Sequence, residues 1–182
     1  IAADQLVSSY AKSFETPSVI IRPFNTFGPR QSLRAVIPTI ISQFATVNKK
    51  NNIIRVGNLK TSRDFVYVND TVSGLISLLK PSCKPGEIYN ICTGKSFKIR
   101  DVIDSLKKIT GHNPKIIVSK NRFRKAEVYN LRGSYKKLYS SSKWKPKYLN
   151  YTGFKKALNE TYKWFKVEKN LSKYSNIQKY NI

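Results

Sequence analysis

The feature that most constrains this chain is a β-branched run followed by a loop rich in proline and arginine. Residues 19–21 form the run, and residues 22–38 follow it. Apolar residues then recur at helical spacing over residues 36–47. A strand, a rigid loop and a helix in this order predict part of an α/β sheet, in which ligands bind beyond the carboxyl ends of the strands. An anion site on this loop and an ordinary turn with solvated charges remain equally open from this pattern alone.

The alternation of short apolar runs and amphipathic segments continues along the chain. Strands are expected at residues 18–22, 53–56, 65–68, 87–91 and 115–118, and helices at residues 1–14, 36–47, 70–79, 101–110, 135–141 and 152–167. Asn69 or Asp70 is expected to cap the helix over 70–79. Asp101 is expected to cap the helix over 101–110, with Gly111 just past its end. The whole pattern predicts the α/β class.

Composition excludes several classes of protein. With 182 residues and 40% hydrophobic content the chain can bury a core, and it has no apolar run long enough for a membrane span. Cys83 and Cys92 are too few for a disulfide framework or a metal site, so we expect buried free thiols in a cytoplasmic protein. His112 lies in a turn and receives no catalytic role. Because the chain starts at Ile1 and contains no Met, we expect that the beginning of a longer protein is absent.

The net charge of +24 raises the alternative of nucleic-acid binding. Residues 1–92 carry 11 Lys and Arg against 5 Asp and Glu, whereas residues 93–182 carry 23 against 5. The excess consists mostly of single lysines among Asn, Tyr, Ser and Ile, without a zinc-finger or RNP-type pattern. We therefore favour a basic drift in composition over nucleic-acid binding.

A series of motifs resembles a known family. The segments that carry the resemblance are residues 1–4, 21–30, 34–38, 63–70 and 144–146. In order and spacing they resemble the later portion of extended short-chain dehydrogenases/reductases, the NAD-dependent nucleotide-sugar epimerases and dehydratases. The string Arg-Pro-Phe-Asn-Thr-Phe-Gly-Pro-Arg-Gln-Ser, followed by Arg-Ala-Val-Ile-Pro, most resembles the 4,6-dehydratases of nucleotide-activated N-acetylhexosamines in legionaminic-type acid synthesis.

The resemblance implies an organisation for the chain. Residues 1–167 would be the C-terminal part of a Rossmann-like doubly wound sheet plus a small α/β substrate-binding domain, and residues 168–182 a flexible basic tail. The family's glycine-rich NAD loop and its catalytic Tyr-x-x-x-Lys pair would precede residue 1. The resemblance thus implies NAD and a homodimer for the intact protein, no catalytic residue in this portion, and no activity for this portion alone.

The resemblance also implies which residues bind ligands. Pro23 and Phe24 would lie beside the nicotinamide end of NAD. Val36 and Ile37 would line the pocket of the nucleotide base. The residues implied for the sugar-nucleotide diphosphate are Asn25, Arg34, Arg63 and Arg124, since guanidinium groups present several donors and stay charged.

Plainer alternatives stand beside these roles. Asn25 would otherwise satisfy its own turn, and Arg63 would otherwise form a surface ion pair with Asp64. Lys125 replaces the family's proline after Arg124, and the loss of a fixed φ puts the geometry of that arginine in question. Glu127 is a candidate for a ribose hydroxyl. Arg22 is assigned to the fold, and the role of Arg30 is left open.

Three functions follow for testing. The first is the nucleotide-sugar-binding portion of an NAD-dependent 4,6-dehydratase, with a 4-epimerase as its sister alternative. The second is a basic nucleic-acid-binding module. The third is an inactive remnant, which would expose the apolar edges of an incomplete sheet.

Overall fold

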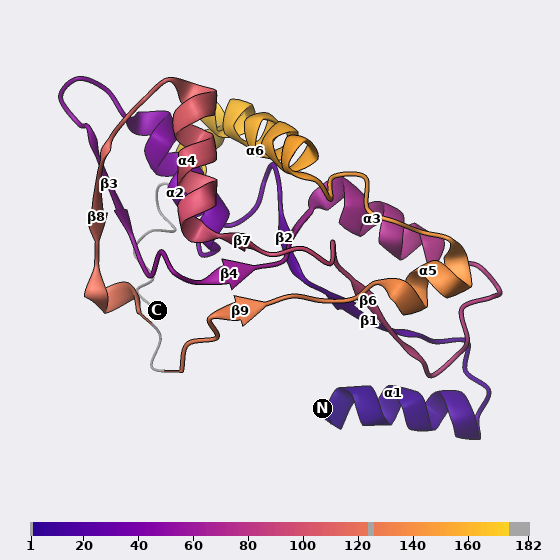
Figure 1. Ribbon diagram of the computed structural model, residues 1–182. Coiled ribbons are helices and arrows are strands. Elements are labelled where there is room, and N and C mark those ends of the chain that lie inside the picture. Colours follow the sequence, from indigo (N-terminus) through magenta and orange to yellow (C-terminus); the bar gives the residue numbers. More distant parts are fainter. Residues whose placement is uncertain (1, 124–125, 175–182) are drawn as a thin grey trace.

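The computed structural model describes residues 2–123 and 126–174 and shows an alternation of helices and strands (Figure 1). The helices are α1 (Ala2–Ser13), α2 (Val36–Thr46), α3 (Val68–Ser77), α4 (Ile99–Thr110), α5 (Lys136–Ser142), α6 (Tyr151–Lys166) and α7 (Glu168–Ser172), with a 3₁₀ turn η1 (Lys120–Arg122). The strands are β1 (Ile20–Pro23), β2 (Asn25–Phe27), β3 (Ile53–Val56), β4 (Ser62–Arg63), β5 (Phe65–Tyr67), β6 (Ile88–Ile91), β7 (Phe97–Lys98), β8 (Lys115–Val118) and β9 (Asn130–Leu131). The expected α/β class is confirmed.

Most strand pairs are parallel and join segments far apart in the chain. The parallel pairs are β1 with β6, β2 with β5, and β3 with β8. Strand β4 lies between β7, which is antiparallel to it, and β9, which is parallel. Because β1 and β6 run in the same direction, the residues that follow them, Phe24 and Cys92, lie at the same edge.

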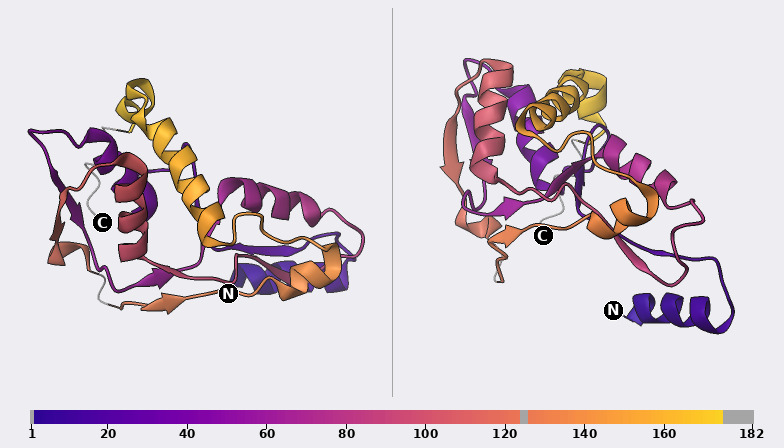
Figure 2. Two further views of the ribbon diagram at one scale, coloured as in Figure 1. Left: turned by 45° about the horizontal axis from the view of Figure 1, so that its top comes forward. Right: turned by 45° about the vertical axis from the view of Figure 1, so that its right-hand side comes forward.

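Two apolar cores hold these pairs in place. In the larger one α2, α4 and α6 pack together beside β3, at one end of the molecule (Figure 1). Its most deeply buried side chains include Ile37, Ile41, Phe44, Leu106 and Phe165. The smaller core lies against β6 and α5, with Tyr89, Ile91, Leu138 and Trp144 inside it. In both views of Figure 2, α1 lies far from β3 and β8.

One helix start differs from the sequence prediction. Asp70 does not cap α3, because Tyr67 occupies the capping position without a side-chain hydrogen bond. The buried Asp70 carboxylate instead accepts hydrogen bonds from the backbone N–H groups of Lys147 and Tyr148, both at 2.9 Å. Asp70 therefore ties α3 to the segment that leads into α6.

At α4 the expected end at Gly111 is confirmed, whereas the expected cap at Asp101 is wrong, because Lys98 occupies the capping position. Asp101 lies three residues beyond the capping position, and its carboxylate accepts the backbone N–H of Lys98 at 3.1 Å. Gly111 ends the helix with φ 72°, a left-handed conformation that glycine adopts without strain.

The C-terminal segment is ordered further than the composition suggests. Residues 168–172 form α7, and Leu171 and Tyr174 pack against the larger core. The ring of Tyr174 lies 5.9 Å from that of Trp164. The first part of the expected flexible tail is thus helical. Residues 175–182 lie outside the described residues. The expected domain boundary at residue 167 stays a prediction. Among the described ranges, no helix is both long and apolar enough to span a membrane.

The thiol of Cys92 gives a test of this packing. The side chain is fully buried at the end of β6, and burial, aided by the nearby Asp64 carboxylate, raises the pKa of the thiol to about 12. The unfolded thiol ionises near its usual pKa of about 8.5, so the unfolded state loses its proton first as the pH rises. We expect the free energy of unfolding to fall above about pH 8.5, by up to about 1.4 kcal/mol per pH unit more in wild type than in Cys92→Ala. Urea unfolding at several alkaline pH values would measure both slopes, and equal slopes would contradict the assignment.

Candidate functional site

A cavity of about 610 Å³ opens where the loop after β2 and the start of α2 face β3, β4 and the segment after β8. The loop can form this wall because it is held at both ends. The amide of Gln31 donates to the backbone carbonyl of Thr26 at 2.6 Å, and the hydroxyl of Thr39 donates to the carbonyl of Leu33. We call this cavity the arginine pocket, because in the described part of the chain Arg34, Arg55, Arg63 and Arg122 line it together with a single carboxylate, Glu127.

Five of the residues expected to bind the nucleotide-sugar meet in this pocket. They are Asn25, Arg34, Val36, Ile37 and Arg63. They come from β2, from the loop before α2, from the first turn of α2 and from β4. Ile37 is fully buried beneath the pocket, whereas Val36 is 39% exposed. The parallel pairing of β2 with β5 brings these segments together although they are far apart in the sequence.

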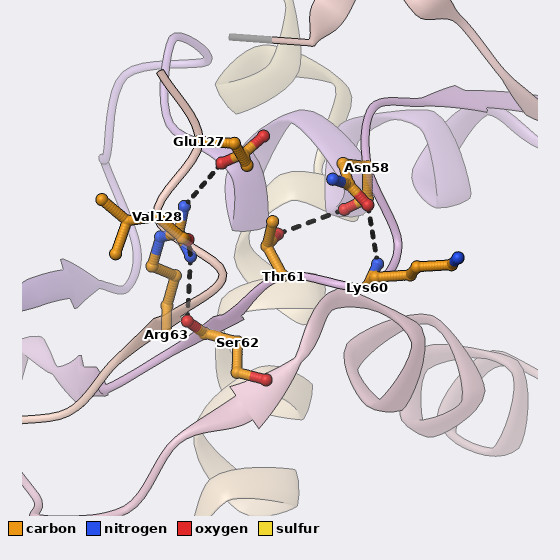
Figure 3. Close-up of polar contacts among 7 residues, drawn as sticks. All are labelled: Asn58, Lys60, Thr61, Ser62, Arg63, Glu127 and Val128. Atoms are coloured by element: carbon orange, nitrogen blue, oxygen red, sulfur yellow. Dashed lines mark hydrogen bonds and ion pairs between the residues drawn. The ribbon is translucent and has the colours of Figure 1, made fainter. Parts of the chain in front are cut away.

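Arg63 is the best-defined polar group of the pocket (Figure 3). One guanidinium nitrogen lies 3.0 Å from the Glu127 carboxylate, and both side chains are largely buried, at 13% and 14% exposure. The other nitrogen donates to the backbone carbonyls of Val128 at 2.5 Å and Ser62 at 2.9 Å. The guanidinium is therefore fixed in place and points into the pocket rather than into solvent.

The alternative ion pair between Arg63 and Asp64 is wrong. Asp64 is completely buried, and its carboxylate faces away from Arg63. It accepts hydrogen bonds from the N–H and hydroxyl of Thr93, at 2.8 and 2.6 Å. It also accepts from the N–H groups of Gly94, at 2.9 Å, and Gly133, at 3.2 Å. Successive strand residues point to opposite faces, which explains why Arg63 and Asp64 serve different segments.

Asn25 and Arg34 have partners of their own. The amide of Asn25 donates to the backbone carbonyl of Asp64 at 3.2 Å, so it joins β2 to the neighbouring strand instead of closing its own turn. Arg34 lies at the exposed side of the pocket, and its backbone N–H donates to the hydroxyl of Ser32 at 3.4 Å. Both side chains line the pocket, and neither role as a ligand is tested by these contacts.

The remaining sequence-based candidates lie elsewhere. Pro23 is exposed at the end of β1, and Phe24 is half-buried against the smaller core. Neither residue lines the arginine pocket, which agrees with separate places for cofactor and substrate. Arg124 and Lys125 lie outside the described residues.

Sequence reasoning missed several residues of the pocket. Arg55 lies on β3 and Arg122 on η1, and the Arg122 guanidinium donates to the backbone carbonyl of Arg55 at 3.1 Å. The pairing of β3 with β8 brings the two arginines together. Asn58 and Thr61, from the turn before β4, complete the wall (Figure 3). In the sequence of β3, apolar and polar residues alternate around Arg55. This alternation was the only signal that could have indicated that Arg55 faces away from the core.

Comparison with known proteins decides the family. The family model for GDP-mannose 4,6 dehydratase matches residues 1–157. The chain belongs to this family. The sequence-based resemblance to nucleotide-sugar epimerases and dehydratases is thereby confirmed, whereas the narrower resemblance to legionaminic-type enzymes stays a prediction.

The chain spans half or less of the length of the known proteins that it resembles. GDP-6-deoxy-D-mannose reductase of Pseudomonas aeruginosa is 33% identical over 148 residues, which are 80% of this chain and 48% of the reductase. Human dTDP-D-glucose 4,6-dehydratase is 40% identical over 92 residues, 50% of this chain and 25% of the human protein.

Solved structures confirm the Rossmann-like fold. The Pseudomonas aeruginosa reductase RMD in complex with NADPH matches with a TM-score of 0.80 at 30% identity, over 91% of this chain and 54% of that one. The dTDP-glucose 4,6-dehydratase of Bacillus anthracis in complex with NAD also gives a TM-score of 0.80, at 22% identity, over 97% of this chain and 52% of that one.

Proposed function

We propose that this chain is the nucleotide-sugar-binding portion of an NAD-dependent nucleotide-sugar 4,6-dehydratase. The observation that carries the proposal is the arginine pocket, in which four arginines of residues 2–123 and 126–174 face one carboxylate of the same ranges. A net positive, partly enclosed site attracts an anion such as a diphosphate, and guanidinium groups can bind its oxygens bidentately. Ile37 and Val36 offer an apolar wall on which a nucleotide base would lie.

The roles of individual residues follow from their places. Arg63, already fixed by two carbonyls, would hold the diphosphate, with Arg34 and Arg124 as further contacts. Asn25 has a second amide hydrogen beyond the one given to Asp64, and this hydrogen would reach the ligand near the diphosphate. Glu127 would accept a ribose hydroxyl once the diphosphate has taken its place beside Arg63.

The residues of this chain that fit NAD form an apolar wall. Pro23 is exposed at the carboxyl end of β1, and Phe24 follows it. Such an edge suits the face of a planar ring, and the end of a parallel strand is where α/β folds bind dinucleotides. When bound, NAD would accept the hydride from C4 of the sugar and return it at C6 after water is lost across C5 and C6. The chain's own part is to hold the sugar-nucleotide in register with that ring.

The family's glycine-rich loop does not occur in these 182 residues. The Tyr-x-x-x-Lys spacing recurs only at residues 139–143, 151–155 and 162–166, far from the place before residue 1 that the resemblance implies. The chemistry would therefore require a further α/β half. Exposed apolar side chains on α1 and α3 support such a half. Leu6 on α1 and Phe14 just after it are 60% and 70% exposed, and Ile76 on α3 and Leu79 just beyond its end are 62% and 83% exposed. Faces of this kind mark contact surfaces in soluble proteins. A homodimer in the cytoplasm stays a prediction for the assembled enzyme.

A binding experiment tests the proposal on the chain as it is. Calorimetric titration with UDP, GDP and dTDP should show saturable binding, whereas the matching nucleosides should bind at least about tenfold more weakly because they lack the diphosphate. Titration with duplex DNA at two salt concentrations tests the alternative of nucleic-acid binding. If no nucleotide bound, or if DNA bound more tightly with a steep salt dependence, the proposal would fail in favour of a basic nucleic-acid-binding module.

A 4-epimerase is the second candidate. A putative UDP-glucose 4-epimerase of Methanocaldococcus jannaschii is 28% identical over 156 residues, 86% of this chain. Both enzymes would use the same nucleotide-sugar pocket and differ in what happens at C5 and C6. Mass spectrometry of the sugar product, with NAD and a polypeptide that includes the upstream coding region, separates them: a dehydratase product has lost one water, and an epimerase product keeps its mass.

The contact between Glu127 and Arg63 leads to a further prediction. Replacing Glu127 by Gln removes the carboxylate that competes with an anion for the guanidinium. We expect inorganic pyrophosphate to bind the arginine pocket about three- to tenfold more tightly in Glu127→Gln. UDP should gain less, since it also loses an acceptor for its ribose.

The measurement follows the backbone amide signal of Gly57, which lines this pocket, in NMR titrations. Glu168→Gln removes an equal charge from exposed α7 and serves as the control. Unchanged or weaker pyrophosphate binding in Glu127→Gln would contradict the expected competition.

A further inference from the structure

We propose that a second cavity, lined by the segments that follow β6 and β9 and by α5, binds the phosphate groups of a small phosphorylated molecule. This cavity has a volume of about 750 Å³ and shares no lining residue with the arginine pocket. We call it the lysine pocket. Its lining consists of Thr93, Gly94, Lys95, Arg132, Gly133, Ser134, Tyr135, Lys136, Tyr139, Lys145 and Leu149.

The charge of the lysine pocket points to an anion. Lys95, Arg132, Lys136 and Lys145 contribute four positive charges, and among the residues that the structure describes no Asp or Glu lines the cavity. All four residues are exposed, and within residues 2–123 and 126–174 none of them forms a salt bridge. Like charges that converge on a concave surface repel one another, and a bound anion relieves this repulsion while the cavity walls limit screening by water.

The floor of the lysine pocket is rigid. It consists of the turn at Thr93 and Gly94 and of Gly133, whose backbone N–H groups all donate to the Asp64 carboxylate. Asp64 is fully buried and its own N–H donates to the carbonyl of Leu131 at 2.8 Å. These contacts hold the ends of β6 and β9 together before any ligand arrives, so little ordering is left to oppose binding.

The remaining lining favours a ligand with an organic part beside its phosphate. The ring of Tyr135 lies over Gly94 and packs edge-on against Trp144, with 5.9 Å between ring centroids. Tyr139, 46% exposed, and Leu149 add apolar surface at the rim. Cationic side chains around an apolar wall suit an organic phosphate ester better than a neutral ligand or a metal ion.

The inference is independent of the proposed function, because the two pockets can be observed separately. Gly94 and Gly133 line the lysine pocket, and Gly57 lines the arginine pocket. In the ¹⁵N-labelled full chain, titration with inorganic pyrophosphate should shift the Gly94 and Gly133 amide signals along a saturating curve. AMP should do the same, and adenosine should not.

Variants establish whether the four charges are responsible. Arg132→Gln with Lys136→Gln should weaken the pyrophosphate affinity read at Gly94 and Gly133 roughly tenfold. Lys95→Gln with Lys145→Gln should have a similar effect, and either pair suffices if the other folds poorly. The matched control, Lys49→Gln with Lys50→Gln, removes two exposed charges from the turn after α2 and should change the affinity less than about twofold.

Three results would overturn the proposal. One is the absence of any shift at Gly94 and Gly133. Another is a shift that rises without saturation, as a general ion atmosphere would produce. The third is an equal loss of affinity in the control pair. A failure of nucleotide binding at Gly57 would instead count against the proposed function and leave the lysine pocket standing.

Discussion

Asp64→Asn is expected to destabilise the fold by about 3 to 5 kcal/mol, a large effect for a change of one atom. The Asp64 carboxylate is fully buried and accepts four hydrogen bonds, three from backbone N–H groups and one from a hydroxyl. An asparagine has one acceptor oxygen and turns an NH₂ group toward two of these donors. Whichever way the amide turns, two donors face an NH₂ group instead of an acceptor, and each donor left without a partner costs part of its desolvation free energy.

Urea unfolding of Asp64→Asn beside Asp104→Asn would measure the effect. Asp104 lies on the exposed face of α4, and removing its charge should change the free energy of unfolding by less than about 0.5 kcal/mol. Asp64→Asn should also broaden the amide signals of Gly94 and Gly133, because both lose their common acceptor. A loss of under about 1 kcal/mol would show that the surrounding segments do not depend on this carboxylate.

The sequence predicted the elements well because local patterns determine them. The spacing of apolar residues located β3 and β8 with their observed bounds, and the helix ending at Gly111 followed from the left-handed preference of glycine. The failures involve contacts that are distant in sequence. Asp70 has the composition of a helix cap but bonds to Lys147 and Tyr148, and β9 forms only because Arg63 and its neighbours provide an edge for it.

The site shows the same division. Asn25, Arg34, Val36 and Ile37 could be selected from one contiguous motif, and the structure brings them to one pocket with Arg63. Arg55 could not be selected, because its place in the pocket depends on the pairing of β3 with β8. The partner of Arg63 was also out of reach: Asp64 is its neighbour in sequence, whereas Glu127 is 64 residues away. Strand geometry sends adjacent side chains to opposite faces, so the nearest carboxylate in sequence is not the nearest in space.

Arg63→Gln is expected to weaken the binding of UDP, GDP and dTDP about 100-fold. Arg63 supplies a fixed, largely buried guanidinium in the arginine pocket, and hydrogen bonds from a charged donor to an anion contribute about 1.5 to 3 kcal/mol each. Glutamine keeps one donor group but removes the charge and the bidentate geometry. Arg63→Lys should fall between the two, since it keeps the charge and loses the planar fork.

Titration of the three nucleotides, followed at the Gly57 amide signal so that binding in the lysine pocket does not contribute, would give the affinities. Arg100→Gln on the exposed face of α4 is the matched control. Arg100→Gln removes the same charge from the surface and should leave the affinity within about twofold of wild type. Thermal unfolding of Arg63→Gln is needed as well, because the same guanidinium joins β4 to Val128 and Glu127. A folded Arg63→Gln protein that binds diphosphates as tightly as wild type would exclude Arg63 from the site. The proposed contact would be supported if folded Arg63→Gln lost affinity for UDP and Arg63→Lys kept part of it. A purely structural role of Arg63 would concern its hydrogen bonds to the two backbone carbonyls and would not depend on the charge that meets the anion.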